Sequence, residues 1–411
     1  MSGLPELEQK SKGEPPMKVQ RVTKEDSLDS KTEEGSSTGS SHSKGLKKVG
    51  FVLSFIGQDY HGSAVQKDVP TIEGEFFKAL REIGVFYKDE VKPSHFRKFS
   101  RASRVDKGVN SVGFFVSMRC ILPENPVELI NEHLPDCIRL LRIMAVSKGL
   151  DSRRNADSRL YSYIVPCYIL KRAPDEVLNY DGPGMSSDIW EQPKYVNFYE
   201  DTFTDEDFER LVRLSKTFPG NRNFWNFSSG MPYSDVKARR ILMDFHPEKI
   251  ITINDVRYVQ MRIYGKSFVL AQIRKMMSML IAMFRGIAPE NVVQYCVDRY
   301  KMNIARAPGE FLCLDLVKFD EYVENVIAHG GGEREFAIYD DDFFAKQAEF
   351  KETVLLPHMA KVEADQEIMK NWVQNLDGRW FFTDCKTIDD TKNRMTEERK
   401  KRTITINMDD L

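Results

Sequence analysis

The sequence has 411 residues, of which 41% are hydrophobic and 30% charged, and its formal net charge is −2. A chain of this length has room for about two to three domains and a substantial core. It has no apolar run long enough to cross a membrane and no secretory signal, and its six cysteines and seven histidines show neither CxxC pairs nor HxxxH or HExxH spacings. We therefore expect a nuclear or cytoplasmic protein without a membrane segment, a disulfide framework or a metal site.

Charge is unevenly distributed along the chain. Residues 320–411 carry 21 acidic and 13 basic side chains, a balance of −8 that leaves the remaining residues at +6. A basic body of this kind favours a polyanionic partner such as a nucleic acid.

The first half of the chain combines a polar tail with an α/β pattern. Residues 1–48 are rich in Ser, Gly, Lys and Glu, which predicts a disordered tail. Hydrophobic periodicity then predicts a β-α-β-α-β unit within residues 49–148. Its elements are expected at 49–57, 72–84 (with Thr71 as N-cap), 112–120, 126–134 and 138–146, and the strand at 112–120 alternates as if it were half-buried.

The pattern begins again over residues 149–319. Strands are expected at 160–168, 256–265 and 311–319, and helices at 203–220, 267–286 and 289–300. Residues 175–195 look like an inserted loop, and residues 320–411 like an acidic, partly helical extension. The expected fold class is α+β (mixed α/β): two similar α/β halves share one largely antiparallel sheet, with a catalytic cleft between them.

The stretch SRASRVDKGV places one carboxylate, Asp106, among Arg101, Arg104 and Lys107. A neighbouring cation lowers the pKa of a carboxylate, so this pattern predicts an ionised Asp106. Such a group can act as a nucleophile, as a base, or as a stabiliser of positive charge on a sugar ring. An isolated RxD pattern is more often a surface ion pair, but Gly108 would allow the loop to aim Asp106 in a defined direction.

A second candidate is DSRLYSYIV, where alternation places Arg159, Tyr161 and Tyr163 on one face of a strand. Aromatic rings beside an arginine can stack on an exposed base. Packing of both tyrosines into the core explains the pattern equally well.

The third candidate is Arg274, which falls inside the apolar stripe of the helix expected at 267–286. An arginine on the buried side of a helix requires an anionic partner, and Asp106 is one possibility. The neighbouring Lys275 is expected to face solvent. Phosphate-binding glycine loops are absent, so the remaining chemistry is carboxylate chemistry on a polyanion, without metal or cofactor.

Taken in this order, the segments resemble the TruA-type tRNA pseudouridine synthases, in particular their eukaryotic branch, from about Val49 to Phe319. Four motifs carry the resemblance: Arg104–Val109; Arg159, Tyr161 and Tyr163; Ala271–Met276; and Gly220–Phe227. Four positions depart from the family pattern: Val105, Arg222, Trp225 and Ala271.

The resemblance implies isomerisation of uridine to pseudouridine in RNA, most naturally tRNA, without a cofactor. Asp106 would open the glycosidic bond, either by attacking the sugar or by removing a sugar proton. Tyr161 would stack on the base and assist loss of the C5 proton, and Arg274 would pair with Asp106. Arg104 would fill the space that the uridine leaves when it swings out of the RNA.

RNA phosphates would be bound by Arg101, Lys107, Arg153 and Arg159. Two other functions remain open from the residues. One is a paralogue that has lost catalysis and acts as an RNA-binding protein or RNA chaperone. The other is a nucleoside hydrolase, which a lone Asp suits less well because glycoside cleavage generally uses two carboxylates.

Overall fold

The fold is described from a computed structural model. The structure describes residues 47–85, 97–174, 200–299, 301–302, 304–329 and 339–377. Most of the predicted tail, the loop expected at 175–195 and the end of the extension lie outside these residues. Within them, no helix has both the length and the apolar character needed to cross a membrane.

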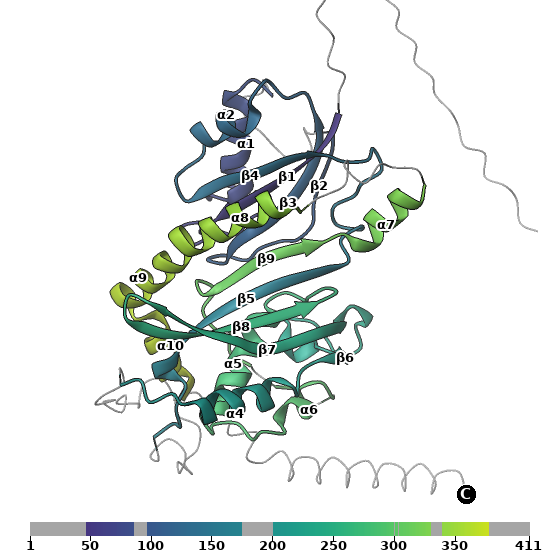
Figure 1. Ribbon diagram of the computed structural model, residues 1–411. Helices are drawn as coiled ribbons and strands as arrows, with labels where there is room; N and C mark the ends of the chain where they lie inside the picture. The colour runs from purple at the N-terminus through teal and green to yellow at the C-terminus, as the bar shows by residue number, and fades with distance from the viewer. Residues whose placement is uncertain are drawn as a thin grey trace, which may run out of the picture. The chain divides into compact units, whose positions relative to one another are not determined.

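All the strands in the described residues belong to one sheet (Figure 1). The strands are β1 (Lys47–Phe55), β2 (Arg97–Arg101), β3 (Asn110–Cys120), β4 (Ile138–Ala145), β5 (Ser158–Pro166), β6 (Gly220–Asn223), β7 (Arg239–Ile253), β8 (Val256–Gly265) and β9 (Leu312–Lys318). Their order is β4-β1-β3-β9-β5-β8-β7-β6, with β2 paired to β3. Every pairing is antiparallel except that of β3 with β9. The predicted mixed fold with a largely antiparallel sheet is confirmed.

The helices lie on both faces of this sheet. They are α1 (Ile72–Glu82), α2 (Pro126–Glu132), α4 (Asp205–Ser215), α5 (Gln272–Phe284), α6 (Val292–Cys296), α7 (Asp320–Ala328), α8 (Asp341–Phe350), η6 (Lys351–Leu355), α9 (Leu356–Gln366) and α10 (Ile368–Asp377). Thr71 caps α1 as predicted, and Thr204 forms a capping box with Asp207 at the start of α4. The long helix expected from residue 267 begins only at Gln272, because Ala271 adopts a left-handed φ of 63°.

The two α/β halves meet where β9 of the second half pairs with β3 of the first. Strands β1–β4 come from the first half and β5–β9 from the second, and they form one continuous sheet. The boundary at residue 148 stays a prediction. The strands β2, β6 and β7 were not predicted, because β2 and β6 are short and β7 carries an irregular polar pattern.

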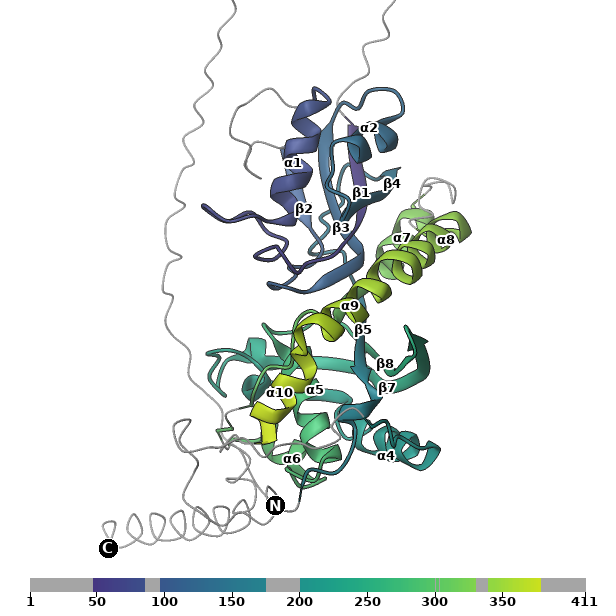
Figure 2. The same ribbon diagram turned by 90° about the vertical axis from the view of Figure 1, so that its left-hand side faces the viewer.

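The prediction of a half-buried β3 is wrong, since almost all of its residues are buried. Figure 2 shows α1 on one side of these strands and α8 on the other. On the α1 side, Phe51 of β1 contacts Phe76 of α1 with ring centroids 5.2 Å apart. On the α8 side, Gln347 donates a hydrogen bond to the backbone of Val112 at 3.0 Å. The C-terminal extension covers the face that the alternating pattern suggested was exposed.

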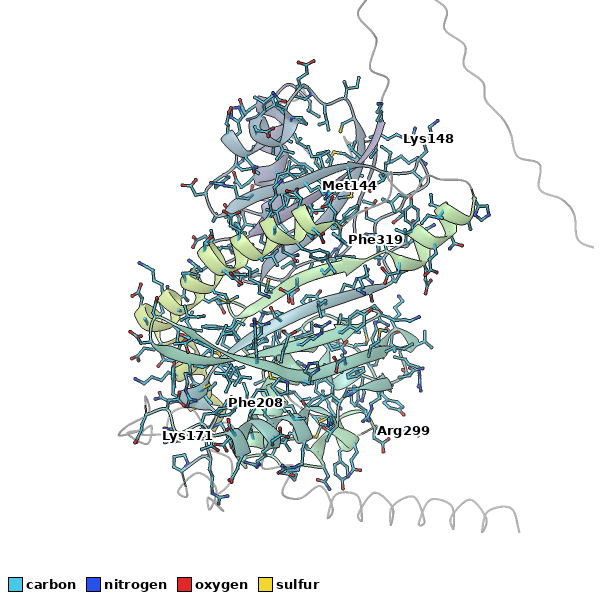
Figure 3. All side chains as sticks on the ribbon, viewed as in Figure 1. Met144, Lys148, Lys171, Phe208, Arg299 and Phe319 are labelled. Atoms are coloured by element: carbon cyan, nitrogen blue, oxygen red, sulfur yellow. The ribbon has the colours of Figure 1, made fainter. Side chains whose placement is uncertain are left out.

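The C-terminal extension is attached to the sheet by polar contacts as well as by apolar packing. Lys351 lies 2.6 Å from the carboxylate of Asp315 on β9 and donates to Ser162 on β5. Phe343 of α8 and Leu355 of η6 belong to the buried core. Just before the extension, Phe319, marked in Figure 3 where β9 leads into α7, packs its ring against that of Phe115 with centroids 4.8 Å apart. The extension also reaches the other face of β5, because the hydroxyl of Tyr163 donates to the sulfur of Met369 on α10 at 3.7 Å.

Candidate active site

A cavity of about 730 Å³ opens beside the loop that leads into β3. Its walls come from this loop, from β5, from the start of β7 and from residues 266–274 at the start of α5. Seven of the eight predicted site residues line it: Arg101, Arg104, Asp106, Arg153, Arg159, Tyr161 and Arg274. Lys107 is exposed and does not line the cavity.

The loop that carries Asp106 is held by two hydrogen bonds between Val105 and Ser63. The amide of Val105 donates to the hydroxyl of Ser63 at 3.0 Å, and the amide of Ser63 donates back to the Val105 carbonyl at 3.0 Å. Gly108 has a φ of 76°, in the left-handed region that favours glycine. This agrees with the prediction that a glycine is needed here for the loop to orient Asp106. The loop therefore presents Asp106 in a fixed position at the cavity wall.

Asp106 is half-buried, and its electrostatics differ from the prediction. Burial raises its pKa, and this effect exceeds the opposing influence of Arg274, of Arg306 and of a hydrogen bond from the backbone of Ala271. The expected lowering by Arg101, Arg104 and Lys107 is wrong, because the cations that act on Asp106 come from α5 and from the segment before β9. This carboxylate is less solvated than the sequence suggested, which makes it a stronger base and nucleophile.

Arg101 interacts with a different acid. It forms two hydrogen bonds with the buried carboxylate of Glu73 on α1, through Nε and, at 2.7 Å, through Nη2. Arg104 also acts electrostatically on Glu73. The local cations thus stabilise Glu73, a residue that sequence reasoning did not single out.

Tyr161 lies in the cavity wall with its ring packed edge-on against Phe268, at 5.3 Å between centroids. Burial raises its pKa to about 12, and the charge of Asp106 acts in the same direction. Its hydroxyl is therefore protonated at neutral pH. In this form the side chain can stack and hydrogen-bond, whereas a phenolate would have to form against the effect of burial.

Arg159 and Tyr163 serve the structure of the wall. Arg159 donates to Ser103 and to the carbonyls of Ala102 (2.8 Å), Ala156 (3.1 Å) and Lys266 (2.7 Å). Tyr163 is fully buried and donates to the carbonyl of Pro308 at 2.9 Å. The RNA-binding role of Arg159 stays a prediction. Of the two readings of the tyrosine pattern, packing into the core applies to Tyr163.

The third motif places Arg274 in the cavity, where its Nε donates to the carbonyl of Ala307 at 2.6 Å. The expectation that Lys275 faces solvent is wrong. α5 is buried almost all round, and Lys275 donates to the carbonyls of Asn226 (3.0 Å) and Ser228 (2.7 Å). Burial lowers its pKa to about 8.

The fourth motif lies outside the cavity lining. Its Asn226 donates to the carbonyl of Cys296 at 2.8 Å and accepts from the amide of Met302, which fixes the segments that follow α5. Trp225, one of the departures from the family pattern, donates to the carbonyl of Asp298 at 2.7 Å. Two further departures, Val105 and Ala271, act at the site through their backbones, so they remove no contact seen at Asp106.

The cavity wall contains two basic residues that sequence reasoning missed, Arg240 and Lys266. Alternation could have marked Arg240 only if β7 had been recognised as a strand. Altogether seven Arg and Lys residues line the cavity, against Asp106 as the one acid in its lining. Among the described residues, no group of three or more His, Cys, Asp or Glu side chains is arranged to hold a metal ion.

The chain is similar over most of its length to proteins from animals and fungi. It is 28% identical to "Pseudouridylate synthase 1 homolog" of Homo sapiens, covering 79% of this chain and 72% of that protein. It is 29% identical to "tRNA pseudouridine synthase 1" of Yarrowia lipolytica, covering 70% of this chain and 66% of that protein. The chain is a homologue of these pseudouridine synthases.

The mouse pseudouridine synthase homologue shows the same relationship, with 27% identity over 80% of this chain and 74% of that protein. No protein-family model matches the chain. The resemblance predicted from four short motifs is therefore confirmed by homologous pseudouridine synthases that align with most of the chain.

Proposed function

We propose that this protein is an RNA pseudouridine synthase that isomerises specific uridines in tRNA, with Asp106 as the catalytic carboxylate. The observation that carries the proposal is the position of Asp106: it is the one acid in the lining of a cavity whose other ionisable residues are almost all cationic, and Tyr161 shares that wall. A cationic cavity suits a polyanionic substrate, and an aromatic ring suits a base. The names of its homologues support the same reaction.

The reaction exchanges one bond of the nucleoside for another. The N1–C1′ bond breaks, the uracil turns, and a C5–C1′ bond forms. C5 then loses its proton and N1 gains one, so no oxidant, reductant or second substrate is consumed. Asp106 would open the first bond, either by attack at C1′ or by removal of the C2′ proton, and both routes require its ionised form.

Its neighbours would keep Asp106 reactive. Burial disfavours the charge, while Arg274 and Arg306 limit that effect, so the carboxylate is ionisable but poorly solvated. The Ala271 amide also donates to it, at the start of α5, where the helix dipole favours an anion. Arg274 would act as a positioning residue for Asp106.

Tyr161 would contact the target base, and Arg104 would fill the space that the flipped uridine leaves in the RNA. The Tyr161 ring would stack on the target uracil, and its protonated hydroxyl would assist transfer of the C5 proton through a hydrogen bond. Arg104 is exposed at the cavity and has no hydrogen-bond or ion-pair partner within the described chain, so it is available to replace the flipped uridine. Arg153 would add a phosphate contact.

The test is pseudouridine content in a pool of unmodified tRNA transcripts incubated with the protein in the presence of a chelator. We expect product with the wild type and none with Asp106→Ala, which should still bind RNA. Intact RNA binding without product from the wild type would reject the proposal in favour of an RNA-binding paralogue. Release of free uracil would instead indicate a hydrolase.

A further inference from the structure

Arg240 contains a buried hydrogen-bond donor with no partner. It lies near the start of β7, and its Nε is buried and unpaired within the part of the chain that the structure describes. Its Nη1 donates to the carbonyl of the preceding Arg239 at 2.9 Å. Unpaired buried donors are rare in folded proteins, because they lose their hydrogen bonds to water without replacement.

The charge of Arg240 is also poorly compensated. In the register of β6 and β7, Arg240 lies directly opposite Arg222, another cation. The acid that influences it is Asp235, whose carboxylate also accepts the amide of Lys237 at 2.8 Å. A guanidinium with a buried, unpaired Nε in these surroundings favours an anion from outside the chain.

Arg240 lines the catalytic cavity together with Asp106. In the same wall Arg159 uses its donors on Ser103 and three backbone carbonyls, as an internal structural arginine does. Arg240 lacks such contacts, although it is held by the same sheet. The contrast indicates that the partner of Arg240 belongs to the substrate.

We infer that Arg240 binds a backbone phosphate of the RNA beside the target uridine and so positions the nucleotide over Asp106. The inference rests on the proposed function and adds a residue to it. A guanidinium fork matches two phosphate oxygens, and such a contact fixes register without reading sequence. Arg240 is a positioning residue, since its ligand is the phosphate and not the reacting uracil.

The test pairs a protein variant with a chemically altered RNA. An RNA hairpin that the wild type modifies is prepared as a series, each member with one neutral methylphosphonate linkage near the target uridine. We expect one linkage at which neutralisation weakens wild-type binding about 10-fold or more. Arg240→Gln should weaken binding of the unaltered RNA to a similar degree. When that variant binds the RNA with the methylphosphonate at this linkage, its affinity should fall no further.

Arg239→Gln is the matched control, because Arg239 is the exposed neighbour on the same strand. At the linkage where the methylphosphonate weakens wild-type binding, the loss of affinity caused by Arg239→Gln and the loss caused by the methylphosphonate should multiply. Arg240→Gln should also make the dependence of log K on log salt less steep by about 1, while Arg240→Lys should restore part of that slope.

Two results would overturn the inference: effects of Arg240→Gln that multiply with the methylphosphonate at every linkage, or wild-type affinity in that variant. The wild-type scan tests it even where a variant folds poorly, because a scan with no sensitive linkage contradicts it. Product formation by the wild type is scored separately, so failure of the proposed function is distinguishable from failure of this inference.

Discussion

The central sheet carries two cavities that differ in how their charged side chains are paired. The cavity that contains Asp106 is lined by seven basic residues, of which Arg104, Arg153 and Arg240 lack ion-pair partners within the described chain. The second cavity, of about 490 Å³ under η6, contains charges that pair with one another. There Lys351 lies 2.6 Å from Asp315, and Arg262 lies 3.2 Å from Glu248.

The difference in charge pairing distinguishes a cavity suited to binding a ligand from one that supports the fold. Charges that find partners inside the protein need no ligand, whereas unpartnered cations around one poorly solvated acid are suited to a polyanion. In the C-terminal extension, α8 and η6 contact Val112, Ser162 and Asp315, which do not line the cavity that contains Asp106. This favours a structural role for α8 and η6, whereas Glu321 of α7 lies 3.9 Å from Lys266 in the wall of that cavity.

The largest expected effect comes from Asp106→Asn. Pseudouridine formation should fall by at least about 1,000-fold, because the variant cannot supply a carboxylate. The pKa of Asp106 is raised in the fold, so the native state holds its proton more tightly than the unfolded chain does, and ionisation costs stability as the pH rises through the raised value. Thermal unfolding at neutral pH should therefore occur at an unchanged or higher Tm, and a clearly lower Tm would contradict this account of the carboxylate.

Tyr161→Phe should reduce the single-turnover rate about 100-fold, the lower range for a group that assists proton transfer, while RNA affinity stays near that of the wild type. The ring that stacks is retained and only the hydroxyl is lost. Tyr161→Leu serves as the comparison and should weaken binding as well. Wild-type rates for Tyr161→Phe would show that only the ring contributes.

Arg274→Gln should shift the acidic limb of the pH–rate profile upward by about 1–3 pH units. Its positive charge is the largest influence opposing the raised pKa of Asp106, so its removal leaves burial less opposed. Arg306→Gln should shift the same limb by less. A profile that stays in place, or a larger shift for Arg306→Gln, would contradict the assignment of Arg274 as the principal cation.

Lys351→Met tests the supporting face. It leaves the carboxylate of Asp315 buried without its cation, which should lower the free energy of unfolding by about 3 kcal/mol. Activity measured well below the unfolding transition should stay within a few-fold of the wild type. Chemical denaturation and initial rates on the same preparation measure both quantities.

Much of the fold was readable from periodicity and caps. The pattern of Ile72, Phe76 and Leu80 behind Thr71 predicts α1 because a helix of this kind buries one stripe. The covering of β3 by α8 was not predictable, since it joins segments more than 200 residues apart, as the contact from Gln347 to Val112 shows.

The sequence identified most residues of the site correctly, but it predicted the wrong charge pairs among them. Motif spacing identified Asp106, Tyr161 and Arg274, and these line one cavity. Local sequence suggested that Arg101 stabilises Asp106, but Arg101 bonds to Glu73. Which charges pair depends on the tertiary structure, and the backbone amide of Ala271 carries no side-chain signal in the sequence.

The most direct test of the central claim uses tRNA transcripts labelled with tritium at C5 of uridine, because isomerisation releases this hydrogen into water. Wild type, Asp106→Asn and Lys351→Met are compared under single-turnover conditions, well below their unfolding transitions. The account predicts rapid release with wild type and Lys351→Met, and no release above background with Asp106→Asn. Release by Asp106→Asn at a rate near that of the wild type would contradict it.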